Sequence, residues 1–135
     1  MLLEIACHYM PRILIIDDDN DLLKISESLL SSRGFKVSIH SDWQHAYSTI
    51  PVFDPDVILL DVFLQDSDGL KICKTLKSSE NTAHIPIIIF SGYPEMAIKI
   101  YDYGADAFIA KPFETTDLVK RIHHVLSGED KIFSC

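Results

Sequence analysis

Five polar residues of this 135-residue chain directly follow short apolar segments. They are Asp17 and Asp18, Asp61, Ser91 and Lys111. Three carboxylates in one crevice repel one another, and their pKa values rise unless cations compensate. Lys111 supplies one positive charge, and a divalent cation supplies two. Because Mg²⁺ prefers hard oxygen ligands such as carboxylates and water, these residues predict a magnesium site.

The same group of side chains fits the transfer of a phosphoryl group. A carboxylate is a nucleophile, a hydroxyl donates a hydrogen bond, and an ammonium supplies a point positive charge. Taken singly, each residue has an ordinary explanation: acids collect at helix N-termini, serine forms turns, and lysine before proline is a solvated loop charge. Taken together, polar groups at the ends of three inner strands favour a site.

Short apolar segments alternate with helical patterns along the chain, which is the pattern of βαβ units. Segments that are apolar almost throughout are typical of strands covered on both faces of a parallel sheet. The segment 35–39 alternates instead, which suits an edge strand. The expected strands are Ile13 to Ile16, Phe35 to Ile39, Val57 to Leu60, Ile87 to Phe90 and Ala107 to Ala110.

The helical patterns between the strands predict five helices. The first has Leu22, Ile25, Leu29 and Leu30 on one stripe, an N-cap at Asp19 or Asn20 and a stop at Gly34. The second is expected to end before Pro51, and the last to be capped by Thr115 or Thr116, with Leu118, Ile122, Val125 and Leu126 buried. The ranges are 21–32, 42–50, 68–77, 93–103 and a final helix from about 115. This α/β chain is expected to form a doubly wound parallel sheet with helices on both faces, which binds ligands beyond the carboxyl ends of its strands.

Composition limits the classes of protein that this chain can represent. A chain of this length with 47% hydrophobic residues fits one globular domain. The net charge of −8 and the pI of about 5.0 argue against binding to nucleic acid or to an anionic membrane surface. Apolar runs are too short for a membrane helix, and Glu4 does not suit a secretory signal, so we expect a cytoplasmic protein. Cys7, Cys73 and Cys135 suggest neither a disulfide framework nor a zinc site.

From about Arg12 to Leu126 the sequence resembles the receiver domains of two-component response regulators. The matching motifs are the acidic pair in Ile-Leu-Ile-Ile-Asp-Asp, Val-Ile-Leu-Leu-Asp with Gly69 eight residues later, Phe-Ser-Gly, and Lys-Pro-Phe. Each motif is common by itself, and their order along the chain makes the match specific. The resemblance implies a flavodoxin-like sheet of five strands in the order 2-1-3-4-5.

The resemblance also implies roles for individual residues. Asp61 is the expected phosphoacceptor, which takes a phosphoryl group from a phosphohistidine. Asp18, Asp61 and the backbone carbonyl of Phe63 are expected to bind Mg²⁺, and Asp17 to hold a water on the metal. Lys111 is expected to contact the phosphoryl group, and the resemblance suggests a cis bond between Lys111 and Pro112.

Further expectations concern signalling rather than the chemical step. Ser91 is expected to hydrogen-bond a phosphoryl oxygen, with the Gly92 amide nearby, and Phe108 to change rotamer with Ser91. Gln65 departs from the family pattern, in which a proline often occupies this position, while Phe63 and Tyr93 occupy positions that tune the lifetime of the phosphoryl group. The donor is expected to be a sensor histidine kinase or a histidine phosphotransfer protein.

The sequence is expected to divide into an N-terminal extension (1–10), a receiver domain (11–128) and a C-terminal tail (129–135). The fourth helix, fifth strand and fifth helix are expected to bind an effector or a second copy, and Asp61 is expected to serve signalling rather than enzymatic turnover. Two other functions share parts of this pattern. A haloacid-dehalogenase-like phosphatase is disfavoured by Asp21 and by the absence of Gly-Asp after Lys111. A flavodoxin-like FMN carrier is disfavoured by the acidic loop after the first strand.

Overall fold

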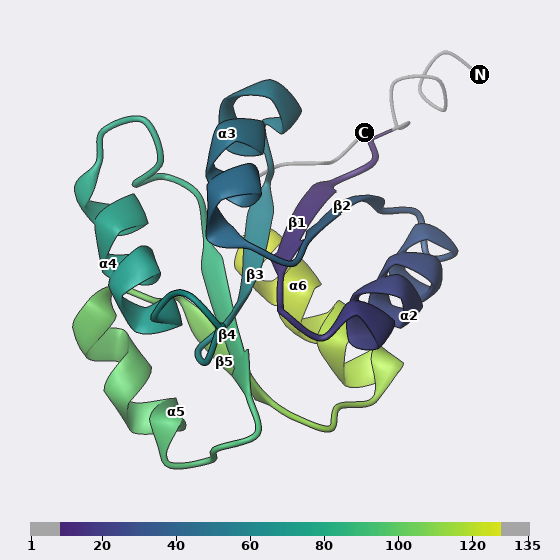
Figure 1. Ribbon diagram of the computed structural model, residues 1–135. Coiled ribbons are helices and arrows are strands. Elements are labelled where there is room, and N and C mark those ends of the chain that lie inside the picture. The colour runs from purple at the N-terminus through teal and green to yellow at the C-terminus, as the bar shows by residue number, and fades with distance from the viewer. Residues whose placement is uncertain (1–8, 128–135) are drawn as a thin grey trace.

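Figure 1 shows the computed structural model of the chain, which describes residues 9–127. Most of the predicted N-terminal extension and all of the predicted C-terminal tail lie outside these residues, as do Cys7 and Cys135. No helix in the described part of the chain is both long and apolar enough to span a membrane.

Within residues 9–127 the strands form one parallel sheet in the order β2-β1-β3-β4-β5. This confirms the predicted sheet and its order. The strand β2 lies at one edge, as its alternating pattern predicts, and β3 and β4 are buried along their whole length. The strands are β1 (Arg12–Ile16), β2 (Lys36–His40), β3 (Val57–Asp61), β4 (Ile87–Ser91) and β5 (Ala107–Ala110).

Helices cover both faces of the sheet, as Figure 1 shows. Leucine and isoleucine side chains of α2 and α6 pack on one face, and those of α3, α4 and the 3₁₀ helix η1 pack on the other. The sheet therefore separates two hydrophobic cores. The helices are α2 (Asn20–Ser31), α3 (Trp43–Phe53), α4 (Gly69–Ser78), α5 (Met96–Lys99), η1 (Ile100–Tyr103) and α6 (Thr115–Leu126).

Two predicted helix ends are wrong. The helix α3 does not stop before Pro51 but continues to Phe53, because a proline near the end removes only its own N–H from the helix. It ends at Asp54, which adopts the left-handed conformation and donates its N–H to the carbonyl of Ile50. At α6 the N-cap is Glu114, whose carbonyl accepts the N–H of Leu118, so Thr115 lies inside the helix and does not cap it.

The predicted helix over 93–103 is divided into a short α5 and the 3₁₀ helix η1. The N–H of Tyr93 bonds to the Ser91 hydroxyl, and the carbonyls of Tyr93 and Pro94 accept bonds from residues three positions later. This tighter bonding delays the start of the α-helix to Met96. The segment ends at Gly104, whose φ of 89° favours glycine.

The buried face of α2 also differs from its prediction. Leu23, Ser26 and Leu30 face the sheet, whereas Ile25 is 56% exposed and Leu29 is 38% exposed. The apolar stripe read from the sequence is wider than the face that the sheet covers. Two large apolar side chains therefore remain at the surface of this helix, which begins beside the acidic loop after β1.

Candidate functional site

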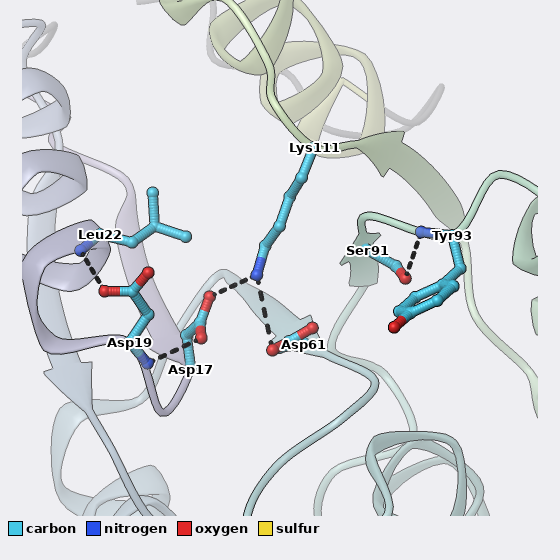
Figure 2. A network of polar contacts seen from close by, with 7 residues as sticks. All are labelled: Asp17, Asp19, Leu22, Asp61, Ser91, Tyr93 and Lys111. Atoms are coloured by element: carbon cyan, nitrogen blue, oxygen red, sulfur yellow. Dashed lines mark hydrogen bonds and ion pairs between the residues drawn. The ribbon is translucent and has the colours of Figure 1, made fainter.

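The loop after β1 holds Asp17 beneath the surface. Asp17 is 1% exposed, and its N–H donates to the carbonyl of His40 at the end of β2. Its Oδ1 accepts the N–H of Asp19 at 3.0 Å, and Asp19 in turn caps α2 by accepting the N–H of Leu22 (Figure 2). This short chain of hydrogen bonds fixes the Asp17 carboxylate at the point where the strand passes into the helix.

Lys111 connects Asp17 to Asp61 across the ends of the strands. Its Nζ lies 2.8 Å from Asp17 Oδ2 and 3.5 Å from Asp61 Oδ2 (Figure 2). Asp61 is the last residue of β3 and is 7% exposed, and Lys111 follows β5 directly. Residues that are far apart in the sequence therefore form one charged group, as the strand-end argument predicts. The peptide bond between Lys111 and Pro112 is cis, which confirms that expectation.

The pKa of the Asp61 carboxyl is raised to about 6, chiefly by burial and secondly by the neighbouring negative charge of Asp17. The Lys111 ammonium acts in the opposite direction and lowers this pKa. The carboxylate therefore lies where negative charge is costly without additional cations.

Asp17, Asp18 and Asp61 each place one carboxylate oxygen within 4.8 Å of the others. A cation that binds all three would meet hard oxygen ligands and would offset their mutual repulsion, so the residues fit Mg²⁺. Asp18 is half-buried, which leaves one side of the group open to water. The expected fourth ligand, the Phe63 carbonyl, belongs to the segment just after β3 and stays a prediction.

Ser91 ends β4 and is fully buried. Its Oγ accepts the N–H of Tyr93 at 3.1 Å, and its carbonyl accepts the N–H of Lys111 at 2.8 Å. Figure 2 shows the Asp61 carboxylate between the Lys111 ammonium and the Ser91 hydroxyl. The hydroxyl proton is not used in the Tyr93 bond and can be donated to another oxygen.

The alternation of side chains along the strands divides the site between the two faces of the sheet. Asp61 lies an even number of residues after Val57 and Leu59 in β3, so the three side chains point to the same face of the sheet. Val57 and Leu59 pack in the core beneath α2 and α6, and Phe90 belongs to that core as well. Ser91 points to the opposite face of the sheet, as does Ile89 two residues earlier in β4. Because Ile89 pairs with Phe108 and Ser91 pairs with Ala110 in β5, Ser91 and Phe108 share this face. Phe108 packs against the core beneath α3 and α4.

Gly69 has a structural role that its motif alone does not explain. Its N–H donates to the Val62 carbonyl at 2.8 Å, and a Cβ at this position would clash with the backbone carbonyl oxygen of Asp61. The loop after β3 can therefore fold back against the Asp61 backbone only with glycine here. The only sequence signal for this contact is the glycine itself.

Phe90 is a residue of the site that the sequence reasoning missed. The Nζ of Lys111 lies over its ring, 4.7 Å from the ring centroid. Phe90 begins the Phe-Ser-Gly motif and ends an apolar segment, but neither pattern indicates a contact with Lys111. The contact depends on the path of the loop after β5, which the sequence does not specify.

Comparison with known proteins agrees with this geometry. The model of the response regulator receiver domain matches residues 13–123. The chain is 34% identical over 125 residues to the DNA-binding dual master transcriptional regulator RpaA of Synechocystis, covering 91% of this chain and 52% of the relative. It is 33% identical over 117 residues to the cell cycle transcriptional regulator CtrA of Caulobacter vibrioides. This match covers 85% of this chain and 50% of CtrA. The chain thus spans about half the length of these curated relatives.

Solved structures show the same fold. A response regulator receiver domain protein of Methanospirillum hungatei superposes with a TM-score of 0.79 at 28% identity, covering 87% of this chain and 94% of the other. The chemotaxis response regulator CheY4 of Vibrio cholerae has a TM-score of 0.80 at 24% identity. This match covers 87% of this chain and 100% of CheY4. The match of the family model over most of the chain shows that it belongs to the response regulator receiver domain family.

Proposed function

We propose that Asp61 is the phosphoacceptor of this receiver domain and takes its phosphoryl group from a phosphohistidine of a sensor histidine kinase or a histidine phosphotransfer protein. The observation that carries the proposal is the Asp61 carboxylate at the end of β3, contacted by the Lys111 ammonium and close to Asp17 and Asp18. This arrangement combines a nucleophile with positive charge and potential metal ligands at one point of the surface.

In the proposed step an oxygen lone pair of the Asp61 carboxylate attacks phosphorus. The new P–O bond forms as the P–N bond to the donor imidazole breaks, and the imidazole nitrogen keeps the bonding electrons and takes a proton from water. Lys111 stabilises the negative charge on the phosphoryl oxygens, and the Ser91 hydroxyl donates a hydrogen bond to one of them. Water later attacks the phosphorus, the bond between phosphorus and the Asp61 oxygen breaks, and inorganic phosphate leaves the free carboxylate.

Asp17, Asp18 and Asp61, together with the Phe63 carbonyl, would hold Mg²⁺ at this site. When bound, the ion neutralises negative charge on the carboxylates and on the phosphoryl group. The domain promotes only its own phosphorylation and dephosphorylation, so we propose a signalling role in the cytoplasm rather than enzymatic turnover of other substrates.

Two surfaces suit the partners of such a domain. Ile25 and Leu29 are exposed on α2, next to the loop that carries Asp17, and suit the protein that delivers the phosphoryl group. On the other side of the molecule Ile98 and Tyr101 are exposed on α5 and η1. A hollow of about 800 Å³ lies between β5 and α6, and its lining includes Phe108. We propose that α5, β5 and α6 bind an effector or a second copy after phosphorylation.

Phosphorylation by a small phosphodonor tests the function directly. Phosphoramidate with Mg²⁺ is expected to modify the protein at Asp61, giving an adduct that hydroxylamine removes and that intact mass spectrometry detects. Asp61→Asn should abolish the adduct, whereas Asp54→Asn, at an exposed acid at the opposite end of the sheet, should leave it unchanged. An Asp61→Asn variant that is modified as readily as the parent would disprove the assignment of the nucleophile.

Hydrogen exchange tests the proposed switch. Beryllofluoride, a mimic of the phosphoryl group, is expected to change exchange over α5, η1, β5 and α6 through Ser91 and Phe108. The matched control is the same addition to Asp61→Asn, which should change nothing. Identical exchange with and without the mimic in the parent protein would count against this surface.

A further inference from the structure

We propose that Phe90 is a positioning residue for phosphoryl transfer, which holds the Lys111 ammonium beside Asp61 through the face of its ring. This proposal rests on the proposed function of Asp61. The Nζ of Lys111 lies 4.7 Å from the centroid of the Phe90 ring, within the distance of about 6 Å at which a ring face attracts a cation. The same Nζ contacts Asp17 at 2.8 Å and Asp61 at 3.5 Å. The ring is therefore the third partner of the ammonium.

The Phe90 ring is itself held in place. Phe90 is 1% exposed and packs in the core beneath α2 and α6. Phe113, two residues after Lys111, meets the ring at a centroid distance of 6.2 Å and an interplanar angle of 61°. The loop that carries Lys111 thus returns to the same ring with a second side chain, so the ring and the lysine stem have a fixed relationship.

An aromatic face suits a lysine that must change partners during the reaction. A lysine ammonium is a point charge on a flexible stem of four carbons, and carboxylate contacts alone hold it only while those carboxylates are free. As the phosphoryl group joins Asp61, negative charge moves from the carboxylate to the phosphoryl oxygens. The quadrupole of the ring does not change in this step, and it attracts the cation over the whole ring face. Lys111 can therefore follow the charge without leaving the site.

Stepwise fluorination of the Phe90 ring separates this role from simple core packing. Replacing Phe90 by mono-, di- and trifluorophenylalanine weakens the negative face of the ring with little change in its size. The measured quantity is the rate constant for phosphorylation of the full chain by phosphoramidate at saturating Mg²⁺, with the melting temperature recorded for each variant. Phe53, at the end of α3 and packed on the opposite core, receives the same analogues as the matched control.

The rate constant is expected to fall steadily along the Phe90 series, by roughly two- to fivefold at the trifluoro analogue, at an unchanged melting temperature. The Phe53 series should show no such trend. In a Lys111→Met background the fluorine dependence should disappear, because no cation remains over the ring. An unchanged rate along the Phe90 series would overturn the proposal, as would an equal trend in the Lys111→Met background or in the Phe53 series.

The contact itself is tested without any phosphodonor. In the free protein the ε-methylene protons of Lys111 are expected to resonate upfield of those of the other lysines because of the ring current, and Phe90→Leu should remove this shift. If the shift is present and the parent protein is not phosphorylated at Asp61, the proposed function fails while the contact stands. If the shift is absent, the role of Phe90 fails whether or not Asp61 is phosphorylated.

Discussion

The rings of Phe63 and Tyr93 meet edge to face, with centroids 4.8 Å apart and an interplanar angle of 68°. Phe63 lies two residues after Asp61, and Tyr93 lies two residues after Ser91. Each of the two residues is 52% exposed, so the pair forms an aromatic wall at the outer side of the proposed phosphorylation site. Hydrolysis of an aspartyl phosphate requires a water in line with the phosphorus, and this wall limits where water can approach.

We therefore expect a long-lived phosphoryl group, and a shorter lifetime when the wall becomes polar. Replacing Phe63→Asn together with Tyr93→Glu supplies groups that orient water and should shorten the lifetime about tenfold, which corresponds to about 1.4 kcal/mol of barrier. The measurement is the decay of the phosphorylated protein in excess Mg²⁺. Val52→Asn, at an 86% exposed position of α3, is the control. An unchanged or longer lifetime in the double variant would refute the shielding argument.

The raised pKa of Asp61 predicts how stability depends on pH in the absence of Mg²⁺. Below the ordinary value of 3.8 the carboxyl is protonated in both the folded and the unfolded chain, so it contributes no difference. As the pH rises toward about 6 the unfolded chain ionises first, and the folded state loses relative stability. Above that pH the loss is complete and amounts to about 1–3 kcal/mol.

Asp61→Asn removes this effect. In EDTA the variant should unfold at a higher urea concentration than the parent at about pH 8, and the difference should shrink toward about pH 4. Urea unfolding of both proteins across this range measures the difference. A difference that is independent of pH, or that grows toward acid, would show that the Asp61 carboxyl is not held in its neutral form by the fold.

Mg²⁺ should stabilise the folded chain, because the cluster of Asp17, Asp18 and Asp61 exists only in the native state. At a free concentration ten times the dissociation constant, the gain in the free energy of unfolding is about 1.4 kcal/mol. The melting temperature should therefore rise with Mg²⁺ for the parent and for the control Asp102→Asn, which lies on η1. The prediction fails if Asp18→Asn retains the full rise.

Gly69→Ala should disturb both the fold and the site. The added methyl group would meet the Asp61 carbonyl oxygen and lie 2.8 Å from the Cα of Val62. We expect a loss of about 1–3 kcal/mol in the free energy of unfolding and slower phosphorylation, because the Asp61 backbone must move. Gly92→Ala is the matched control, since a Cβ there has no neighbour within 4 Å among the described residues. Equal stability of the two variants in chemical denaturation would contradict the prediction.

The sequence was a good guide where burial alone decides the structure. Apolar segments without polar interruptions predicted the strands to within a residue or so, and the polar residues after them predicted the contacts of Lys111 with Asp17 and Asp61. The sequence was a weaker guide to helix ends, where local hydrogen bonds compete with the regular bonding of the helix. The continuation of α3 past Pro51 depends on the left-handed Asp54, and the late start of α5 depends on the bond from Tyr93 to the Ser91 hydroxyl.

Contacts made by apolar residues were the hardest to foresee. A leucine or phenylalanine at helical or strand spacing has the same pattern whether it packs in the core, remains exposed or meets a charge. Ile25 belongs to the predicted apolar stripe of α2 and is at the surface. Phe90 belongs to an apolar strand and to the Phe-Ser-Gly motif, and its ring lies under the ammonium of Lys111. Both outcomes depend on how elements are placed relative to each other, which periodicity does not encode.

The placement of Asp61 and Ser91 on opposite faces of the sheet has a genetic consequence. In a domain that works as proposed, random mutagenesis should yield two classes of signalling mutant. Substitutions in the core beneath α2 and α6 would abolish the response to the kinase, because they disturb Asp61 and Phe90. Substitutions in the core beneath α3 and α4 would yield alleles that are phosphorylated normally yet are permanently silent or permanently active, because they reach Ser91 and Phe108. Because Asp61 ends β3 and Ser91 ends β4 on opposite faces of one sheet, selection can alter sensitivity and output separately.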